Sequence, residues 1–249
     1  MSVSFSSRSL SIVIPAYCEA DNIVGTLENV TDAAAAVGLM YEVIVIDDGS
    51  TDGTGALVAA CVSRFPRVRL LVNERNRGFG WSYQRGVNAA TLANIVMVHG
   101  DNAWGRQTLQ DFFGRVGEAD VIVGYTREMS RSRTWTRTVV SRTFTRILNL
   151  ITGRHLQYYN GLQIHPSPVL KSMRIESTGY GFQAEVLVKS LRQTRTFVEV
   201  PMDLTERTHG ESKAFRVANV VDVVETLVRL CVLEWTSGAK SAAASVASR

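Results

Sequence analysis

The stretch YEVIVIDDGSTDGT, from Tyr41 to Thr54, decides the fold class of this 249-residue chain. Its first half is a short apolar run rich in Val and Ile, which is typical of a strand covered on both faces of a mainly parallel sheet. Two carboxylates, Asp47 and Asp48, end the run, and the turn of Gly, Ser and Thr that follows can cap a helix. The stretch therefore predicts a strand that ends in acidic side chains and leads into a helix.

The same pattern recurs along the chain, with helix-like segments between the apolar runs. The expected strands are 10–16, 41–47, 68–73, 94–99, 119–124 and 196–201, and the expected helices are 19–37, 52–64, 78–91, 108–116, 133–152, 182–192 and 215–235. Strand and helix alternating in this way predict an α/β fold, with a mainly parallel sheet flanked by helices. Ligands bind such sheets beyond the carboxyl ends of the strands.

Composition fits one globular domain and excludes several other classes of protein. With 45% hydrophobic and 20% charged residues and a net charge of +4, the chain is neither disordered, collagen-like nor a coiled coil. The positive charge is concentrated between Arg127 and Arg154, where seven arginines face only Glu128 and give that segment a charge of +6. We therefore expect an anionic partner at this segment.

Cysteine spacing and hydropathy bear on location. Cys18, Cys61 and Cys231 lack the spacing of zinc ligands, and we expect three buried free thiols in a reducing cytosol. The first residues do not resemble a signal peptide, and no apolar window approaches the roughly 18 residues that a spanning helix needs. The expected location is the cytoplasm.

Residues just after three of the expected strands could carry chemistry. Tyr17 could stack on a base, Glu19 and Asp48 could accept hydrogen bonds from a base or ribose, and Asp101 could ligate Mg²⁺. Each has a structural alternative, because Asp48 can stabilise a turn and Glu19 and Asp101 can cap helices.

Four motifs in order resemble the inverting family 2 glycosyltransferases of GT-A fold. They are SIVIPAYCEADNI, VIVIDDGSTDGT, NERNRGFGWSYQRGVNAA and a strand ending in HGD, at residues 11–23, 43–54, 73–90 and 99–101. The resemblance implies a Rossmann-like domain and a nucleoside diphosphate sugar as donor. It assigns Pro15, Tyr17, Glu19, Ile46, Asp48 and Gly78 to the donor, and Asp101 to a catalytic Mg²⁺ or Mn²⁺.

The metal motif departs from the family pattern, which has Asp-x-Asp after this strand. One register places His99 at the first position and Asp101 at the second, so that His99 is a candidate metal ligand beside Asp101. The other register places Asp101 first and Ala103 last. One carboxylate is absent in either register.

The segment from Glu206 to Lys213, ERTHGESK, resembles the R-x-x-G-x-S-K segment of the polyprenyl-phosphate glycosyltransferases, the dolichol-phosphate mannose synthase type. That resemblance implies transfer to dolichyl or undecaprenyl phosphate at the cytoplasmic face of a membrane, with peripheral contact. It gives catalytic roles to Arg207 and Lys213, which would neutralise phosphates. The candidates for the acceptor phosphate are Arg127, Arg137, Ser141 and Arg142.

A phosphate acceptor also has a physical argument in its favour. A phosphate monoester is nucleophilic at neutral pH and needs positioning rather than a strong base. A sugar hydroxyl of a glycan or glycolipid needs a base, for which Glu185 or Asp203 are candidates. A nucleotide-sugar-binding protein with weak catalysis is a further alternative. A dehydrogenase is disfavoured because G-x-G-x-x-G is absent, and no nucleic-acid-binding module accompanies the arginines.

The same features predict the organisation of the domain. Residues 1–125 form a nucleotide-sugar-binding half and residues 126–214 an acceptor-binding half. Residues 215–236 form a helix that packs on the domain or contacts a membrane, and residues 237–249 form a disordered tail.

Overall fold

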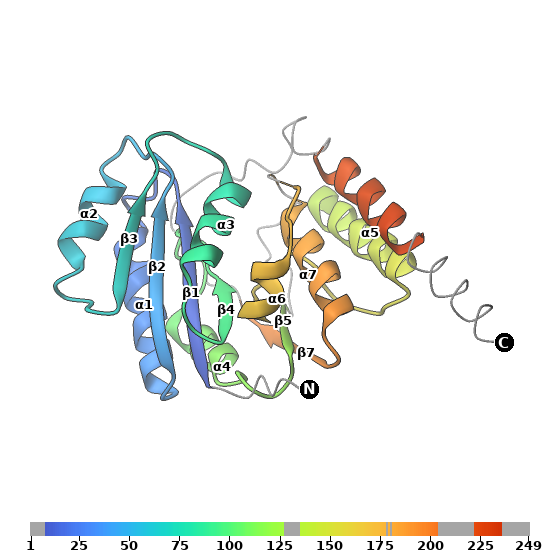
Figure 1. The fold of residues 1–249 in the computed structure, drawn as a ribbon, viewed down its shortest axis with the longest axis horizontal. Helices are drawn as coiled ribbons and strands as arrows, with labels where there is room; N and C mark the ends of the chain where they lie inside the picture. Colours follow the sequence, from blue (N-terminus) through green and yellow to red (C-terminus); the bar gives the residue numbers. More distant parts are fainter. Residues whose placement is uncertain (1–7, 127–134, 178, 180, 204–221, 236–249) are drawn as a thin grey trace.

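A seven-stranded sheet forms the centre of the computed structural model (Figure 1), with its strands in the order β3-β2-β1-β4-β6-β5-β7. The structure describes residues 8–126, 135–177, 179, 181–203 and 222–235. All pairings are parallel except those of β6, which runs antiparallel to β4 and β5. The predicted α/β class with a mainly parallel sheet is confirmed.

Six of the seven strands match the apolar runs, and most helices lie where the pattern places them. The strands are β1 Ser9–Ala16, β2 Met40–Asp47, β3 Val68–Val72, β4 Asn94–Met97, β5 Val121–Thr126, β6 Gln163–Pro166 and β7 Phe197–Met202. The helices are α1 Ile23–Ala36, α2 Thr54–Cys61, α3 Phe79–Ala89, α4 Arg106–Phe113, α5 Trp135–Thr152, α6 Ser167–Ser172 and α7 Phe182–Gln193, and residues 222–235 are also helical.

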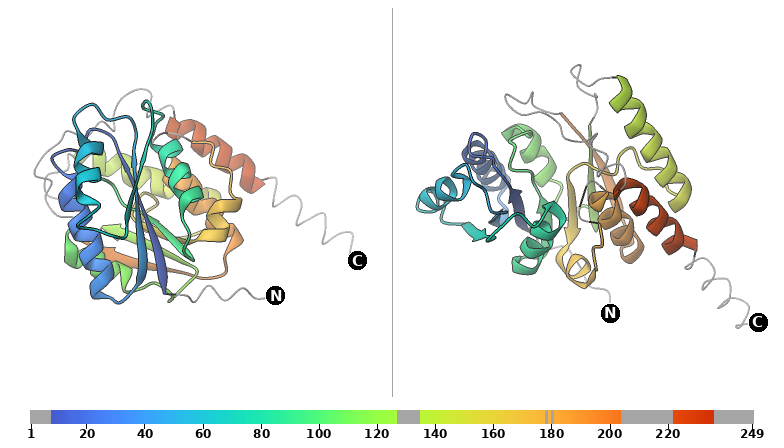
Figure 2. Two further views of the ribbon diagram at one scale, coloured as in Figure 1. Left: turned by 60° about the vertical axis from the view of Figure 1, so that its left-hand side comes forward. Right: turned by 90° about the horizontal axis from the view of Figure 1, so that it is seen from above.

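Helices cover both faces of the sheet because side chains of each strand alternate between the faces. In β1, Ile12 and Ile14 join the cluster built with α1 and α4, whereas Val13 joins the cluster built with α3, α6 and α7. A third cluster brings α5 and α7 together with Leu230 of the 222–235 helix. Figure 2 shows the sheet between these layers, with the 222–235 helix and α5 at the same end of the molecule.

The strand order defines the ligand-binding edge. Strands β2 and β3 lie on one side of β1, and β4, the next strand along the chain, lies on the other side. A topological switch point of this kind leaves a crevice beyond the carboxyl ends of the flanking strands, where open α/β sheets bind ligands. The loops after β1, β2 and β4 therefore meet at one edge.

Two elements, β6 and α6, were not expected from the sequence. The four residues of β6 include Gln163 and His165, so the strand lacks the apolar character that marks the others. Both side chains are nevertheless buried, at 6% and 1% exposure. Hydrogen bonds compensate their burial: His165 contacts the Ser190 hydroxyl at 2.9 Å and the Gln163 amide oxygen at 3.1 Å.

Burial lowers the pKa of His165 to about 3. Below about pH 6.5 the unfolded chain takes up a proton at this side chain, and the folded chain does not. The free energy of unfolding therefore falls by up to about 1.4 kcal/mol for each unit by which the pH decreases. We expect His165→Gln to flatten the acid side of the stability profile between about pH 6.5 and 5. Urea unfolding at several pH values measures the free energy of unfolding, and His155→Gln, which changes an exposed histidine, is the control. If the profile of His165→Gln is as steep as that of the wild type, His165 is not the source of the pH dependence.

Two expectations about local structure were wrong. Helix α1 begins at Ile23 rather than at Glu19, because residues after β1 form turns that bond to the loop after β2. The cysteines are free but not buried: Cys18 and Cys231 are exposed, and Cys61 is intermediate. Within the described residues, no helix is long and apolar enough to cross a bilayer.

Candidate functional site

The loops after β1 and β2 are joined by hydrogen bonds. The backbone N–H of Glu19 donates to the Thr54 hydroxyl, and that of Ala20 to the Asp52 carboxylate, both at 2.9 Å. Burial alone would raise the pKa of Asp52, but the hydrogen bonds from Thr54 and Ala20 outweigh it and hold that pKa below its ordinary value. The edge formed by these two loops is therefore preorganised.

Asp48 organises the loop after β3. One carboxylate oxygen accepts from the Asn73 amide at 2.6 Å and from the Arg77 backbone at 2.9 Å, and the other accepts from the Gly78 backbone at 2.9 Å. A carboxylate offers about four acceptor positions, so these bonds leave capacity for one more N–H or O–H group. Asp48 is 4% exposed and links the loops after β2 and β3.

The polar side chains that support Asp48 were missed by the sequence analysis. Asn73 donates to the Ser82 hydroxyl at 3.0 Å and accepts a hydrogen bond from Arg85. The Arg77 guanidinium lies 4.5 Å from the ring centroid of Trp81, a cation–π contact. The third motif contained these residues, but only the folded chain shows that Asn73 and Arg85 contact one another.

The other residues assigned to the donor lie at the same edge and differ in exposure. Tyr17 is 44% exposed, so its ring is accessible to a ligand. Glu19 is partly buried and accepts from the Asn22 amide at 3.0 Å. Pro15 and Ile46 are register partners inside β1 and β2 and are buried, which places them behind the site rather than on its surface. The donor roles of these residues stay predictions.

The end of β4 places His99 in an aromatic contact. Its ring stacks on Phe79, the first residue of α3, with centroids 4.9 Å apart and planes at 11°. Phe182 of α7 contacts the other side chain of this stack, Phe79, edge-on at 5.2 Å. His99 therefore joins the loop after β4 to α3 and, through Phe79, to α7.

The residues that follow Asp101 pack against the rest of the domain. Asn102 turns toward α1, where its side-chain oxygen accepts from Asn29 at 2.8 Å, and Ala103 is 3% exposed. The register that starts at Asp101 therefore ends on a buried methyl group. Asp101 itself is partly exposed and accepts from the Ala103 backbone at 3.3 Å. The other register pairs Asp101 with His99.

The residues at this edge fit a cation that takes most of its ligands from substrate and water. Among the described residues, no group of three or more His, Cys, Asp or Glu side chains could hold a metal ion. Mg²⁺ is commonly bound through one or two carboxylates together with substrate phosphates and waters. Asp101 can supply one such carboxylate, so a cation would bind here only together with the diphosphate of a substrate.

A hollow on α5 contains two of the predicted acceptor residues. It has a volume of about 160 Å³ and is lined by Ser141, Arg142, Thr145, Arg146, Gln157 and Tyr158. Arg142 and Arg146 are exposed one helical turn apart, and three hydroxyl-bearing residues, Ser141, Thr145 and Tyr158, line the same hollow. Guanidinium and hydroxyl donors in one concave surface suit a phosphate group.

Glu185 has a structural role, because its carboxylate holds the backbone that precedes α7. It is 1% exposed, and its carboxylate accepts from the backbone of Glu176 at 3.0 Å, from that of Ser177 at 2.8 Å and from Lys189 at 2.5 Å. Burial opposes ionisation, yet Lys189 and the two backbone N–H groups hold the pKa of Glu185 below its ordinary value. A buried carboxylate that already accepts three hydrogen bonds, one of them from a lysine, is poorly suited to accept a proton from an acceptor. Asp203 is exposed.

Several predicted residues cannot be placed. Arg127, Arg207 and Lys213 lie outside the described residues, as does the side chain of Arg137. The predicted tail at 237–249 and the first part of the predicted helix at 215–236 also lie outside them. The helical residues 222–235 agree with the remainder of that helix.

Comparison with known families and sequences gives a consistent picture. Residues 11–178 match the profile of glycosyl transferase family 2. The chain is 27% identical over 216 residues to the undecaprenyl-phosphate mannosyltransferase of Micrococcus luteus, covering 81% of this chain and 85% of that protein. It is 25% identical to the undecaprenyl-phosphate 4-deoxy-4-formamido-L-arabinose transferase of Edwardsiella ictaluri, covering 88% of this chain and 66% of that one.

Solved structures agree on the fold. The glucosyl-3-phosphoglycerate synthase of Mycobacterium tuberculosis, in complex with Mn²⁺, uridine-diphosphate-glucose and phosphoglyceric acid, superposes with a TM-score of 0.71 at 20% identity. The match covers 90% of this chain and 80% of that chain. The same synthase in complex with Mg²⁺ and uridine-diphosphate superposes with a TM-score of 0.69. At this identity the likeness establishes the GT-A fold.

Proposed function

The chain belongs to glycosyl transferase family 2, and we propose that it moves a sugar, with inversion, from a nucleoside diphosphate sugar to a polyprenyl phosphate such as undecaprenyl or dolichyl phosphate. The observation that carries the acceptor class is the hollow on α5 with Arg142 and Arg146. The two undecaprenyl-phosphate transferases, which align over 81% and 88% of this chain, support the same class.

The donor would lie across the carboxyl ends of β1, β2 and β4. Tyr17 offers an exposed ring for a base, and Asp48 retains capacity to accept one hydrogen bond. Asp101 would hold Mg²⁺ or Mn²⁺ on the diphosphate, with His99 beside it. When bound, the cation offsets negative charge that develops on the departing nucleoside diphosphate.

The arginines would position the acceptor phosphate for attack. An oxygen of that phosphate forms a bond to the anomeric carbon, while the bond from that carbon to the diphosphate oxygen breaks on the opposite side. The nucleoside diphosphate leaves with the electron pair, and the configuration at the carbon inverts. The acceptor oxygen is already anionic, so no protein base is required. Arg127, Arg137, Arg207 and Lys213 are proposed to add positive charge along this path.

The rival proposal, transfer to a sugar hydroxyl, is weakened by the environment of Glu185. Its carboxylate is engaged by two backbone N–H groups and by Lys189. Among its two candidate bases only Asp203 remains exposed. A donor-binding protein with weak catalysis would bind sugar nucleotides and form no product.

Peripheral contact with a membrane would give the protein access to a lipid acceptor. Large apolar side chains are exposed on two helices that pack together, namely Val139, Val140, Ile147 and Leu150 of α5, and Val224, Val228, Val232 and Trp235 of the 222–235 helix. Figures 1 and 2 both show these helices side by side. Exposed valines with a tryptophan and nearby arginines suit an anionic lipid surface.

Replacing Arg142 and Arg146 together with alanine should raise the KM for polyprenyl phosphate by at least about tenfold, because each charge-assisted hydrogen bond to phosphate contributes about 1.5–3 kcal/mol. Steady-state kinetics with varied acceptor at saturating donor measure the effect. Arg64→Ala removes an exposed arginine that pairs with Glu28 and is the matched control. An unchanged acceptor KM in the double variant contradicts the assignment of the hollow.

The donor half is tested separately from the acceptor half. Sugar nucleotides that differ in base and sugar are screened for thermal stabilisation of the protein, with and without Mg²⁺ or Mn²⁺. We expect one nucleotide class to raise Tm, and the rise to depend on the cation. If no sugar nucleotide stabilises the protein, the proposed donor site is wrong.

A further inference from the structure

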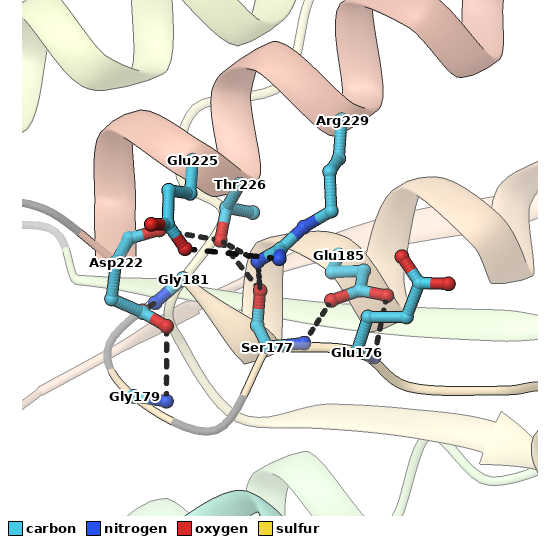
Figure 3. A network of polar contacts seen from close by, with 9 residues as sticks. All are labelled: Glu176, Ser177, Gly179, Gly181, Glu185, Asp222, Glu225, Thr226 and Arg229. Atoms are coloured by element: carbon cyan, nitrogen blue, oxygen red, sulfur yellow. Dashed lines mark hydrogen bonds and ion pairs between the residues drawn. The ribbon is translucent and has the colours of Figure 1, made fainter.

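The 222–235 helix is joined to the residues that precede α7 by a partly buried network of polar contacts (Figure 3). The described residues of this segment that make the contacts are Glu176, Ser177, Gly179 and Gly181. Because the helix also carries the exposed valines and Trp235, one helix joins an apolar surface to this segment. The contacts on its inner side therefore bear on the rest of the site.

Asp222 makes the first contact. One of its carboxylate oxygens accepts from the backbone N–H of Gly179 at 3.3 Å, and the other accepts from that of Gly181 at 2.8 Å. Both positions require glycine on steric grounds: a Cβ at 179 would lie 2.8 Å from the Asp222 carboxyl carbon, and one at 181 would lie 2.2 Å from the Thr226 hydroxyl. The Asp222 carboxylate thus accepts hydrogen bonds from the backbone at two positions, and a side chain at either position would clash with the 222–235 helix.

Hydroxyl groups add further contacts one turn along the helix. Thr226 and Ser177 are 0% and 2% exposed, and their hydroxyls lie 2.5 Å apart. Arg229 donates to the Ser177 hydroxyl at 2.8 Å. On the opposite side, Glu185 accepts from the backbone of Ser177 at 2.8 Å. Ser177 is therefore held between the 222–235 helix and α7, and Gly179 and Gly181 are bonded to the same helix.

This segment leads directly into the aromatic contact at the candidate site. Phe182 follows Gly181 and packs edge-on against Phe79 at 5.2 Å, and Phe79 stacks on His99 at 4.9 Å. His99 stands two residues before Asp101. The chain of contacts from Asp222 to the loop after β4 is continuous through Gly181, Phe182 and Phe79.

We propose that Asp222 is a positioning residue of the transfer reaction. Its carboxylate sets the backbone at Gly179 and Gly181, and through Phe182 it sets the Phe79–His99 stack beside Asp101. This role rests on the proposed function, because it assigns the site at the end of β4 to the diphosphate and the reacting carbon. The same helix presents Val224, Val228 and Val232 to solvent, so the seating of this helix and the geometry of the site depend on one carboxylate.

The test compares Asp222→Ala and Asp222→Asn with Glu225→Ala. Glu225 lies on the same helix, is exposed and approaches Arg229 only at 3.9 Å, so its loss removes a carboxylate without touching the glycines. We expect Asp222→Ala to lower kcat by about 10- to 100-fold, the size of effect that a small misplacement of reacting groups produces. Affinity for the donor nucleotide should fall much less than kcat, because Tyr17 and Asp48 lie on other elements and keep their contacts. Asp222→Asn retains one acceptor oxygen and should recover part of kcat.

Hydrogen exchange separates positioning from a general loss of stability. In Asp222→Ala the amides of Gly179 and Gly181 should exchange faster, while amides in β1 and β2 remain protected. A kcat equal to that of the wild type, or a loss of donor affinity equal to the loss of kcat, overturns the proposal. If Asp222→Ala does not fold, Asp222→Asn is decisive, and an unchanged kcat in it overturns the proposal. A wild-type protein that forms no glycolipid overturns the proposed function itself.

Discussion

Replacing Asp101 with alanine should lower kcat for sugar transfer by about 10³-fold. Both registers of the metal motif contain Asp101, and of the two residues after it Asn102 bonds to α1 and Ala103 is buried. Loss of cation-assisted charge stabilisation costs several kcal/mol in the transition state, and each 1.4 kcal/mol is about one decade in rate. Initial rates with saturating donor and acceptor, over a range of Mg²⁺ and Mn²⁺ concentrations, measure the loss.

The control for that experiment is Asp111→Ala. Asp111 is exposed on α4 and accepts only a side-chain bond from Gln107 at 2.8 Å among the hydrogen bonds described, so its removal should leave kcat unchanged. The two variants should have Tm values close to that of the wild type. Substantial activity in Asp101→Ala, with unchanged dependence on the cation, would remove Asp101 from the proposed metal site.

Replacing Asp48 with alanine should weaken donor binding by at least about tenfold and lower the free energy of unfolding by about 3 kcal/mol. The variant leaves the Asn73 amide and the backbone N–H groups of Arg77 and Gly78 without their acceptor. Buried donors that lose a charged partner cost about 1–3 kcal/mol each before relaxation. Calorimetric titration with the nucleoside diphosphate that stabilises the wild type gives the affinity, and urea unfolding gives the stability.

Asp52→Ala is the comparison for Asp48→Ala. Asp52 is a neighbouring carboxylate that is exposed and bonds to the loop after β1 and to Thr54. The loss of Asp52 should lower the free energy of unfolding by about 1 kcal/mol, like the loss of a helix cap. It should weaken donor binding less than Asp48→Ala does, because Asp52 acts on the site only through the loop after β1. If Asp48→Ala binds the nucleotide as tightly as the wild type, Asp48 serves the loop alone.

The strands and the binding edge could be predicted because their signals are local. Uninterrupted Val and Ile in residues 43–46 require burial on both faces, and a carboxylate that follows such a run must lie at the end of a strand. The motif that contains Asp48 therefore placed it correctly. Its partners could not be read in the same way, because Asn73 and Gly78 approach it only when β2 and β3 pair.

The antiparallel strand β6 was missed for a physical reason. Gln163 and His165 are polar, and the cost of burying them is offset by hydrogen bonds with each other and with Ser190, which lies 25 positions along the chain from His165. The hydrogen bonds from Gly179 and Gly181 to Asp222 were missed for the same reason, since they join residues more than 40 positions apart. Patterns of hydropathy report burial and say nothing about such pairings.

Mass spectrometry of the lipid product tests the proposed sugar transfer most directly. The protein is incubated with its stabilising sugar nucleotide, the preferred cation and undecaprenyl phosphate, and the organic phase is extracted and analysed. We predict a lipid with one sugar and one phosphate, together with release of the nucleoside diphosphate. A lipid with two phosphates, or sugar found only on a hydroxyl acceptor while undecaprenyl phosphate returns unchanged, would contradict the account.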